Sequence, residues 1–138
     1  MKPLRDNIMK KKSGKFSVLI VDDATFVRNK LKKVVEKMDF AEVVGEASNG
    51  LEAISLYKKL NPDLVTMDLV MPNIDGIQAI EDIMAYDKNA NIIVVSAMGQ
   101  DLSIKEAVEK GAKEYIKKPF KDDEVYTIIE RIIKNNNN

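Results

Sequence analysis

The stretch PDLVTMDLVMPNIDG, residues 62–76, joins the pattern of a buried strand to a loop that begins with an acidic residue. The run Leu64-Val65-Thr66-Met67 is largely apolar, and Asp68 follows it directly. Met71-Pro72 and Asp75-Gly76 then indicate a rigid loop. An Asx-turn could explain the aspartate alone, so the rest of the chain has to decide whether Asp68 has a chemical role.

Four more runs of the same kind predict short strands, at residues 16–21, 41–47, 91–96 and 114–117. Their hydrophobicity is mostly continuous rather than alternating, which is typical of strands covered on both faces in a parallel sheet. Apolar residues at helical spacing occur between and after the runs, from Val27 to Met38, Ala53 to Leu60, Ile77 to Met84, Ile104 to Val108 and Val125 to Ile133. Five strand–helix repeats predict an open α/β sheet with helices on both faces.

The expected helix ends follow from residues that cap or break helices. Asn49 and Asp75 are suited to open the second and third helices, and Asp101 or Ser103 the fourth. Gly111 is a candidate to close the fourth helix.

The composition restricts both the size and the chemistry of the protein. A chain of 138 residues corresponds to one ordinary domain, and 45% hydrophobic residues can build a sizeable core. The sequence has no cysteine and no histidine, which excludes disulfides, thiolate metal sites and a histidine base. Catalysis would have to use carboxylates, hydroxyls, lysine or a hard cation bound through oxygen.

The charge is divided unevenly between the N-terminus and the body. Residues 1–15 hold six basic residues and one acidic residue, so they carry +5, and the remainder of this neutral chain carries −5. We interpret residues 1–15 as a disordered arm, residues 16–134 as the folded domain and residues 135–138 as an asparagine tail. Nucleic-acid binding has no support beyond the arm. The sequence lacks a signal peptide and an apolar stretch long enough to cross a membrane, which favours a cytoplasmic protein. We also expect it to be a monomer.

Five polar residues follow the predicted strands, where open α/β sheets bind their ligands. They are Asp22, Asp23, Asp68, Ser96 and Lys118. Taken singly, an acid of the pair could cap a helix, the serine could satisfy loop backbone, and the lysine could be a solvated surface charge. Three carboxylates at one place repel one another, so their combination favours a bound cation.

Mg²⁺ suits such a cluster because it takes carboxylate, phosphate and water oxygens. With the acids neutralised, one carboxylate could attack a phosphoryl group and form an aspartyl-phosphate. Charge stabilisation would come from the cation, Lys118 and the Ser96 hydroxyl. The sequence therefore predicts a phosphoryl-transfer site at this edge, with Asp68 facing into it.

The segments VLIVDDA, PDLVTMDLVMPNIDG, VVSAMGQ and GAKEYIKKPF, in this order, resemble the receiver domain of two-component response regulators, over roughly residues 16–134. The stand-alone chemotaxis type, CheY, is the most similar, in its Gram-positive or archaeal form. The resemblance implies a flavodoxin-like doubly wound (βα)5 fold with strand order 2-1-3-4-5 and five helices.

The resemblance also implies a role for each site residue. Asp68 would be the phosphoacceptor, with Asp22, Asp23, Asp68 and the Val70 backbone carbonyl as Mg²⁺ ligands. Ser96 and Tyr115 would form the switch, in which the hydroxyl turns toward the phosphate and the aromatic ring follows it inward. Lys118 would contact the phosphate, and its bond to Pro119 would be cis.

The partners implied by the resemblance are a CheA-type histidine kinase and a motor switch or adaptor protein. The latter would bind the face of the fourth helix, fifth strand and fifth helix. Apolar residues at Val70 and Met98 cannot orient an attacking water, which predicts slow self-dephosphorylation and a possible separate phosphatase.

Alternative functions remain open at this point. A phosphorelay intermediate would use the same residues, and the sequence hardly separates it from a chemotaxis switch. A haloacid-dehalogenase-type phosphatase needs a second acid two residues after its nucleophile, but Thr25 occupies that position after Asp23. A nucleotide-binding flavodoxin-like module lacks the glycine-rich phosphate loop. We expect a signalling switch that catalyses only its own phosphorylation and dephosphorylation, not an enzyme with a separate substrate.

Overall fold

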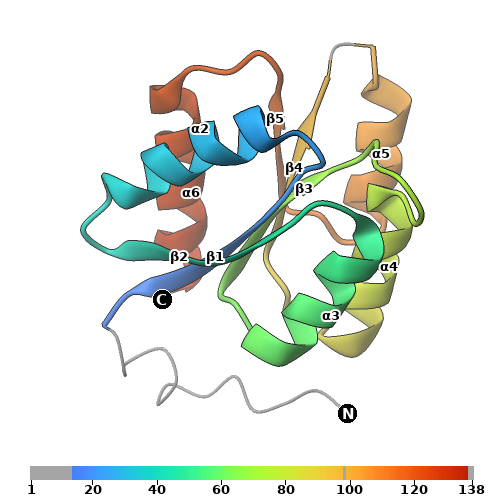
Figure 1. Ribbon diagram of the computed structural model, residues 1–138, viewed down its shortest axis with the longest axis horizontal. Coiled ribbons are helices and arrows are strands. Elements are labelled where there is room, and N and C mark those ends of the chain that lie inside the picture. The colour runs from blue at the N-terminus through green and yellow to red at the C-terminus, as the bar shows by residue number, and fades with distance from the viewer. Residues whose placement is uncertain (1–13, 98, 137–138) are drawn as a thin grey trace.

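The computed structural model describes residues 14–97 and 99–136, which form a five-stranded parallel sheet between two layers of helices (Figure 1). The strand order is β2-β1-β3-β4-β5, which confirms the predicted order. The strands are β1 (Phe16–Val21), β2 (Ala41–Ala47), β3 (Leu64–Asp68), β4 (Ile92–Ser96) and β5 (Glu114–Lys117). The basic residues 1–13 and Met98 lie outside the described part.

Two helices cover one face of the sheet and three cover the other (Figure 1). The helices are α2 (Thr25–Glu36), α3 (Gly50–Leu60), α4 (Gly76–Tyr86), α5 (Asp101–Glu109) and α6 (Asp122–Asn136). Helices α2 and α6 share a face, and α3, α4 and α5 lie on the opposite one. None of the described helices is long and apolar enough to cross a membrane.

The three central strands, β1, β3 and β4, are buried on both faces because their side chains alternate between the two helical layers. In β1, Leu19 packs toward α3 and α4, whereas Val18 and Ile20 pack toward α2 and α6. Every residue of β3 and β4 is buried. This sandwich is the structural reason for the continuous apolar runs in the sequence.

The helix ends mostly follow the expected capping residues. Asn49 and Asp75 cap α3 and α4, and their side chains accept hydrogen bonds from the amides of Glu52 and Gln78 at 2.8 and 3.0 Å. The prediction for α5 is wrong, because Gln100 occupies its N-cap position. Helix α6 extends to Asn136, two residues into the segment interpreted as a tail.

Candidate functional site

The carboxyl ends of four strands form one edge of the sheet and bring the predicted polar residues together. Asp22 and Asp23 follow β1, Asp68 and Ser96 are the last residues of β3 and β4, and Lys118 follows β5. These strands are neighbours and parallel, so their ends lie side by side. Segments separated by almost 100 residues in the chain therefore build one site.

Three carboxylates gather at this edge. Asp22, Asp23 and Asp68 each offer an oxygen, and these oxygens lie within 4.8 Å of one another. Asp22 and Asp68 are buried, with 0% and 4% of their surface exposed, whereas Asp23 is exposed. Burial of two neighbouring acids is costly unless a positive charge compensates them.

Lys118 supplies part of that compensation. Its Nζ lies 2.8 Å from Asp22 Oδ2 and 3.6 Å from Asp68 Oδ1. Only 22% of its side chain is exposed, so the alternative of a solvated surface lysine is wrong. The Lys118 amide donates to the Ser96 carbonyl at 2.6 Å, and the peptide bond to Pro119 is cis.

The environment of Asp68 opposes ionisation. Burial, followed by the nearby charge of Asp22, raises the pKa of Asp68 from 3.8 to about 6. Lys118 and a hydrogen bond from the Val70 amide act in the opposite direction but do not balance the first two effects. The metal-free site therefore holds more negative charge than its own residues neutralise.

The donor set fits a hard divalent cation. Mg²⁺ binds oxygens at about 2.0–2.1 Å in an octahedron, so two oxygens on one ion lie about 3–4 Å apart. The acid cluster is close to this spacing, and a water can complete a longer contact. Within residues 14–97 and 99–136, the buried Asp22 Oδ2 has no hydrogen bond and only the ion pair with Lys118, so this oxygen can also bind a cation.

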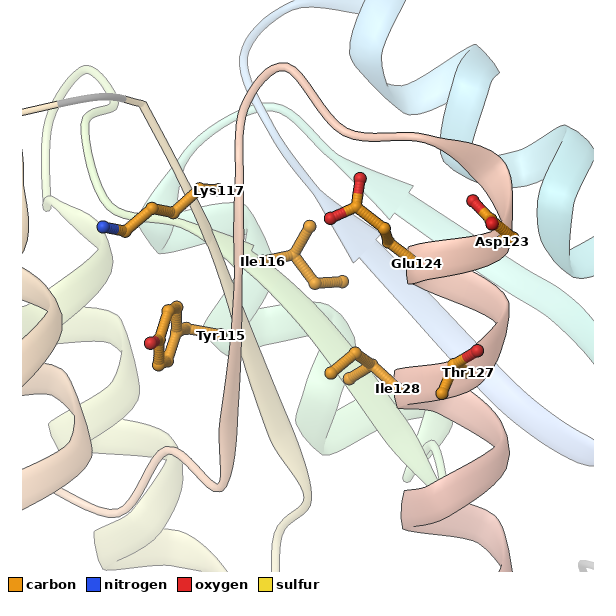
Figure 2. A pocket seen from close by; sticks show the side chains of 7 residues that line it. All are labelled: Tyr115, Ile116, Lys117, Asp123, Glu124, Thr127 and Ile128. Atoms are coloured by element: carbon orange, nitrogen blue, oxygen red, sulfur yellow. The ribbon is translucent and has the colours of Figure 1, made fainter.

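The two residues predicted as a switch occupy different environments. Ser96 is fully buried, and its Oγ has no hydrogen-bond partner among the described residues. Tyr115 is 49% exposed, and Figure 2 shows it on the same side of β5 as Lys117, opposite Ile116. A buried hydroxyl without a partner calls for an explanation, such as a ligand that it could bind.

Of the two structural alternatives for the acids, the helix cap is wrong and the Asx-turn contact is present. The N-cap of α2 is Ala24, and no side chain caps this helix, so neither Asp22 nor Asp23 has that role. Asp22 Oδ1 does accept a hydrogen bond from the Ala24 amide at 2.9 Å. Asp68 Oδ1 accepts from the Val70 amide at 3.3 Å, so an Asx-type contact coexists with its position in the site.

Gly76 is a residue of the site whose role the sequence did not reveal. A Cβ at this position would lie 2.1 Å from the Asp68 carbonyl oxygen and 2.6 Å from the Leu69 Cα. The start of α4 thus packs directly on the backbone at the end of β3, and the Gly76 amide donates to the Leu69 carbonyl at 3.0 Å. The Asp75-Gly76 pair combines a helix cap with this close approach.

Comparison with known proteins gives one consistent family. The response regulator receiver domain family matches residues 18–130. A chemotaxis protein CheY of Thermotoga maritima is 51% identical over 117 residues, covering 85% of this chain and 97% of that protein. The CheY of Listeria monocytogenes is 49% identical, covering 85% and 98%.

A solved structure supports the same assignment at the level of the fold and the sequence. The CheX–CheY–BeF3–Mg²⁺ complex from Borrelia burgdorferi is similar, with a TM-score of 0.81 and 36% identity over 89% of this chain and 93% of that chain. The family match covers most of the described domain. The chain therefore belongs to the family of response regulator receiver domains.

Proposed function

We propose that this protein is a chemotaxis response regulator that accepts a phosphoryl group on Asp68 from a CheA-type histidine kinase. The observation that supports this most directly is the position of Asp68, with its carboxylate near two other acids and 3.6 Å from the Lys118 ammonium. The identity of about 50% to CheY proteins favours chemotaxis over a phosphorelay. We place the protein in the cytoplasm as a monomer.

In the proposed reaction, an Asp68 carboxylate oxygen forms a bond to phosphorus while the phosphorus–nitrogen bond of the kinase phosphohistidine breaks. The electron pair of that bond stays on the ring nitrogen, and the imidazole leaves as a neutral base because its other ring nitrogen already carries a proton. Lys118 stabilises negative charge on the phosphoryl oxygens, and the Ser96 hydroxyl donates a hydrogen bond to one of them. Asp22, Asp23, Asp68 and the Val70 carbonyl would hold Mg²⁺, which when bound would supply positive charge to neutralise the acids and the phosphoryl oxygens.

The signal would leave the site through Ser96 and Tyr115. Movement of the serine toward the phosphoryl group vacates space that the exposed tyrosine ring can enter, which shifts a two-state surface. This surface, formed by α5, β5 and α6, is where a motor switch or adaptor protein would bind. Beside β5 it has a groove of about 540 Å³, lined by Tyr115, Ile116, Lys117, Asp123, Glu124, Thr127 and Ile128 (Figure 2).

The side chain of Val70 is 61% exposed and, being apolar, cannot direct water to an acyl phosphate. We therefore propose slow self-dephosphorylation and a separate phosphatase. The other position in this argument, Met98, lies outside the described residues.

The test is phosphorylation by acetyl phosphate with Mg²⁺, followed by intact-mass measurement. Wild type and the control Asp39→Asn, an exposed loop acid, should each gain one phosphoryl group. Asp68→Asn should gain none, and EDTA should abolish the gain in all variants. Equal phosphorylation of Asp68→Asn would refute the assignment of the acceptor. A pull-down with and without beryllofluoride would then test whether the partner is a motor protein.

A further inference from the structure

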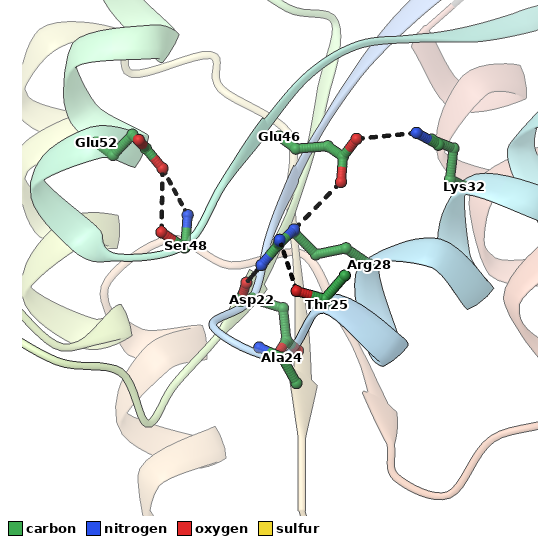
Figure 3. Close-up of polar contacts among 8 residues, drawn as sticks. All are labelled: Asp22, Ala24, Thr25, Arg28, Lys32, Glu46, Ser48 and Glu52. Atoms are coloured by element: carbon green, nitrogen blue, oxygen red, sulfur yellow. Dashed lines mark hydrogen bonds and ion pairs between the residues drawn. The ribbon is translucent and has the colours of Figure 1, made fainter.

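Helix α2 contacts the backbone of Asp22, the first acid of the pair, through the side chain of Arg28. The Arg28 guanidinium donates three hydrogen bonds (Figure 3). Nη1 donates to the Asp22 backbone carbonyl at 2.6 Å, Nη2 to Thr25 Oγ1 at 3.2 Å and Nε to Glu46 Oε1 at 3.2 Å. Only 16% of the side chain is exposed, and the contacts with Asp22 and Glu46 are partly buried, whereas the contact with Thr25 is exposed.

Glu46, on β2, holds the guanidinium in this orientation. Its second oxygen accepts a hydrogen bond from Lys32 Nζ at 3.0 Å. The Lys32 hydrogen bond, with Arg28, lowers the pKa of Glu46, so the carboxylate stays ionised around neutral pH. Arg28 is therefore fixed by a charged partner on β2 and by Thr25 of its own helix, and its Nη1 donates to the Asp22 carbonyl.

The carbonyl that Arg28 binds belongs to the peptide group that joins Asp22 to Asp23. A peptide group is planar and includes the Cα atoms of both residues. A hydrogen bond that restrains its oxygen therefore also restrains the orientation of Asp22 and Asp23. The Asp22 amide is held as well, since it donates to the Ala47 carbonyl at 3.0 Å. Arg28 completes the restraint on the turn that presents the two acids.

We infer that Arg28 is a positioning residue that raises the Mg²⁺ affinity of the site by holding the Asp22–Asp23 peptide so that both carboxylates face the cation. This inference rests on the proposed function in one respect, that the acid cluster binds Mg²⁺. Arg28 touches neither the cation nor the phosphoryl group. Its direct Coulomb effect is opposite in sign, because a positive charge near the site repels a cation.

The opposite signs make the inference testable with a matched pair of variants. Arg28→Gln and Lys32→Gln remove the same charge from the same helix, and both residues pair with Glu46. Only Arg28 also binds the Asp22 carbonyl. Calorimetric titration with Mg²⁺ alone, at fixed ionic strength, should show about tenfold weaker binding for Arg28→Gln and unchanged or slightly tighter binding for Lys32→Gln.

Two further variants separate geometry from charge. Arg28→Lys keeps the positive charge but loses the fork that reaches three acceptors, so it should also bind Mg²⁺ more weakly. Glu46→Gln should weaken binding in wild type but have little further effect in Arg28→Gln, because it acts through the arginine. Thermal unfolding in EDTA identifies the temperature at which every variant is folded, and the titrations are made below it.

Binding of Arg28→Gln that is equal to or tighter than that of wild type would overturn the inference and leave charge as the only effect of Arg28. Full affinity in Arg28→Lys would also overturn it. A wild-type protein that binds no Mg²⁺ would instead overturn the proposed function, so the two failures can be told apart.

Discussion

Replacing Asp68 with asparagine should stabilise the metal-free protein at neutral pH, although the change adds no packing. The carboxylate is buried beside Asp22, and the pKa of Asp68 is raised from 3.8 to about 6. One pKa unit corresponds to about 1.36 kcal/mol, so ionised Asp68 lowers the free energy of unfolding by about 3 kcal/mol at pH 8. Asparagine has a similar shape and no charge, and it should recover much of this amount.

The effect should depend on pH in a defined window. Below pH 4 the Asp68 carboxyl group is protonated in both the folded and the unfolded state, so the wild type pays no ionisation cost. Between pH 4 and 6 the unfolded chain releases the proton while the folded chain keeps it, so the wild type loses stability as the pH rises. Above pH 6 to 7 the difference from Asp68→Asn should be constant and at its maximum.

Urea unfolding followed by circular dichroism, in EDTA and at several pH values from 4 to 8, would measure this difference. Asp39→Asn serves as the control because its side chain is exposed, and it should follow the wild type. Thermal midpoints should differ by roughly 10 °C at pH 8 for a domain of this size. Saturating Mg²⁺ should reduce the gap, since it binds the ionised wild type more tightly than the amide.

A wild type as stable as Asp68→Asn at pH 8 in EDTA would contradict the physical account of the site. So would a stability difference that is the same at pH 4 and pH 8. Either result would mean that Lys118 balances the acids without a metal ion, which would remove the electrostatic case for Mg²⁺.

Three further substitutions test other contacts. Gly76→Ala should lower the free energy of unfolding by about 3 kcal/mol, because the added Cβ meets the Asp68 carbonyl oxygen. Unfolding in urea measures this change, and an unchanged midpoint would contradict the close approach of α4 to the Asp68 carbonyl. Lys118→Gln should raise the pKa of Asp68 above about 6, as carbon-13 NMR titration would show, and a lower value would be inconsistent with their ion pair. Asp63→Asn should lower the free energy of unfolding by about 1–3 kcal/mol, because it weakens the hydrogen bonds that Asp63 accepts from Ser17. Calorimetry should find its Mg²⁺ affinity unchanged, and weaker Mg²⁺ binding would contradict a purely structural role of Asp63.

The fold was predictable because one physical cause, burial on both faces, is recorded directly in the sequence. Continuous apolar runs identified the strands, with β1, β2 and β5 at the observed bounds. The order of the strands came from the resemblance to receiver domains, since runs of this kind do not state which strands are neighbours. The predicted start of α5 was wrong because Asp101 and Ser103, which suit a cap by residue type, lie inside the first turn, while Gln100 at the N-cap makes no side-chain capping bond.

The members of the site were predictable, but their interactions were not. The rule that ligands bind at the carboxyl ends of parallel strands selected Asp22, Asp68 and Lys118 from sequence alone. The ion pairs among them depend on distances that only the packed sheet defines. Arg28 was missed because helical spacing predicts which face of α2 is buried but not which loop a long side chain at the edge of that face contacts.

A comparison of the two edges of the sheet explains why we assign a chemical role to the carboxyl edge and not to every buried acid. At the opposite edge, Asp63 is also buried, but its carboxylate accepts hydrogen bonds from the Ser17 amide at 2.8 Å and hydroxyl at 3.2 Å. At the carboxyl edge, Ser96 Oγ is equally buried but has no hydrogen-bond partner in the described part of the chain, and Asp22 Oδ2 has only its ion pair with Lys118 there. Buried polar groups are normally satisfied, because leaving one without a partner costs about 1–3 kcal/mol. The Asp63 carboxylate is therefore stabilised within the fold, whereas the polar groups of the carboxyl edge would reach their lowest free energy with a cation and an anion in place, as the proposed phosphoryl transfer requires.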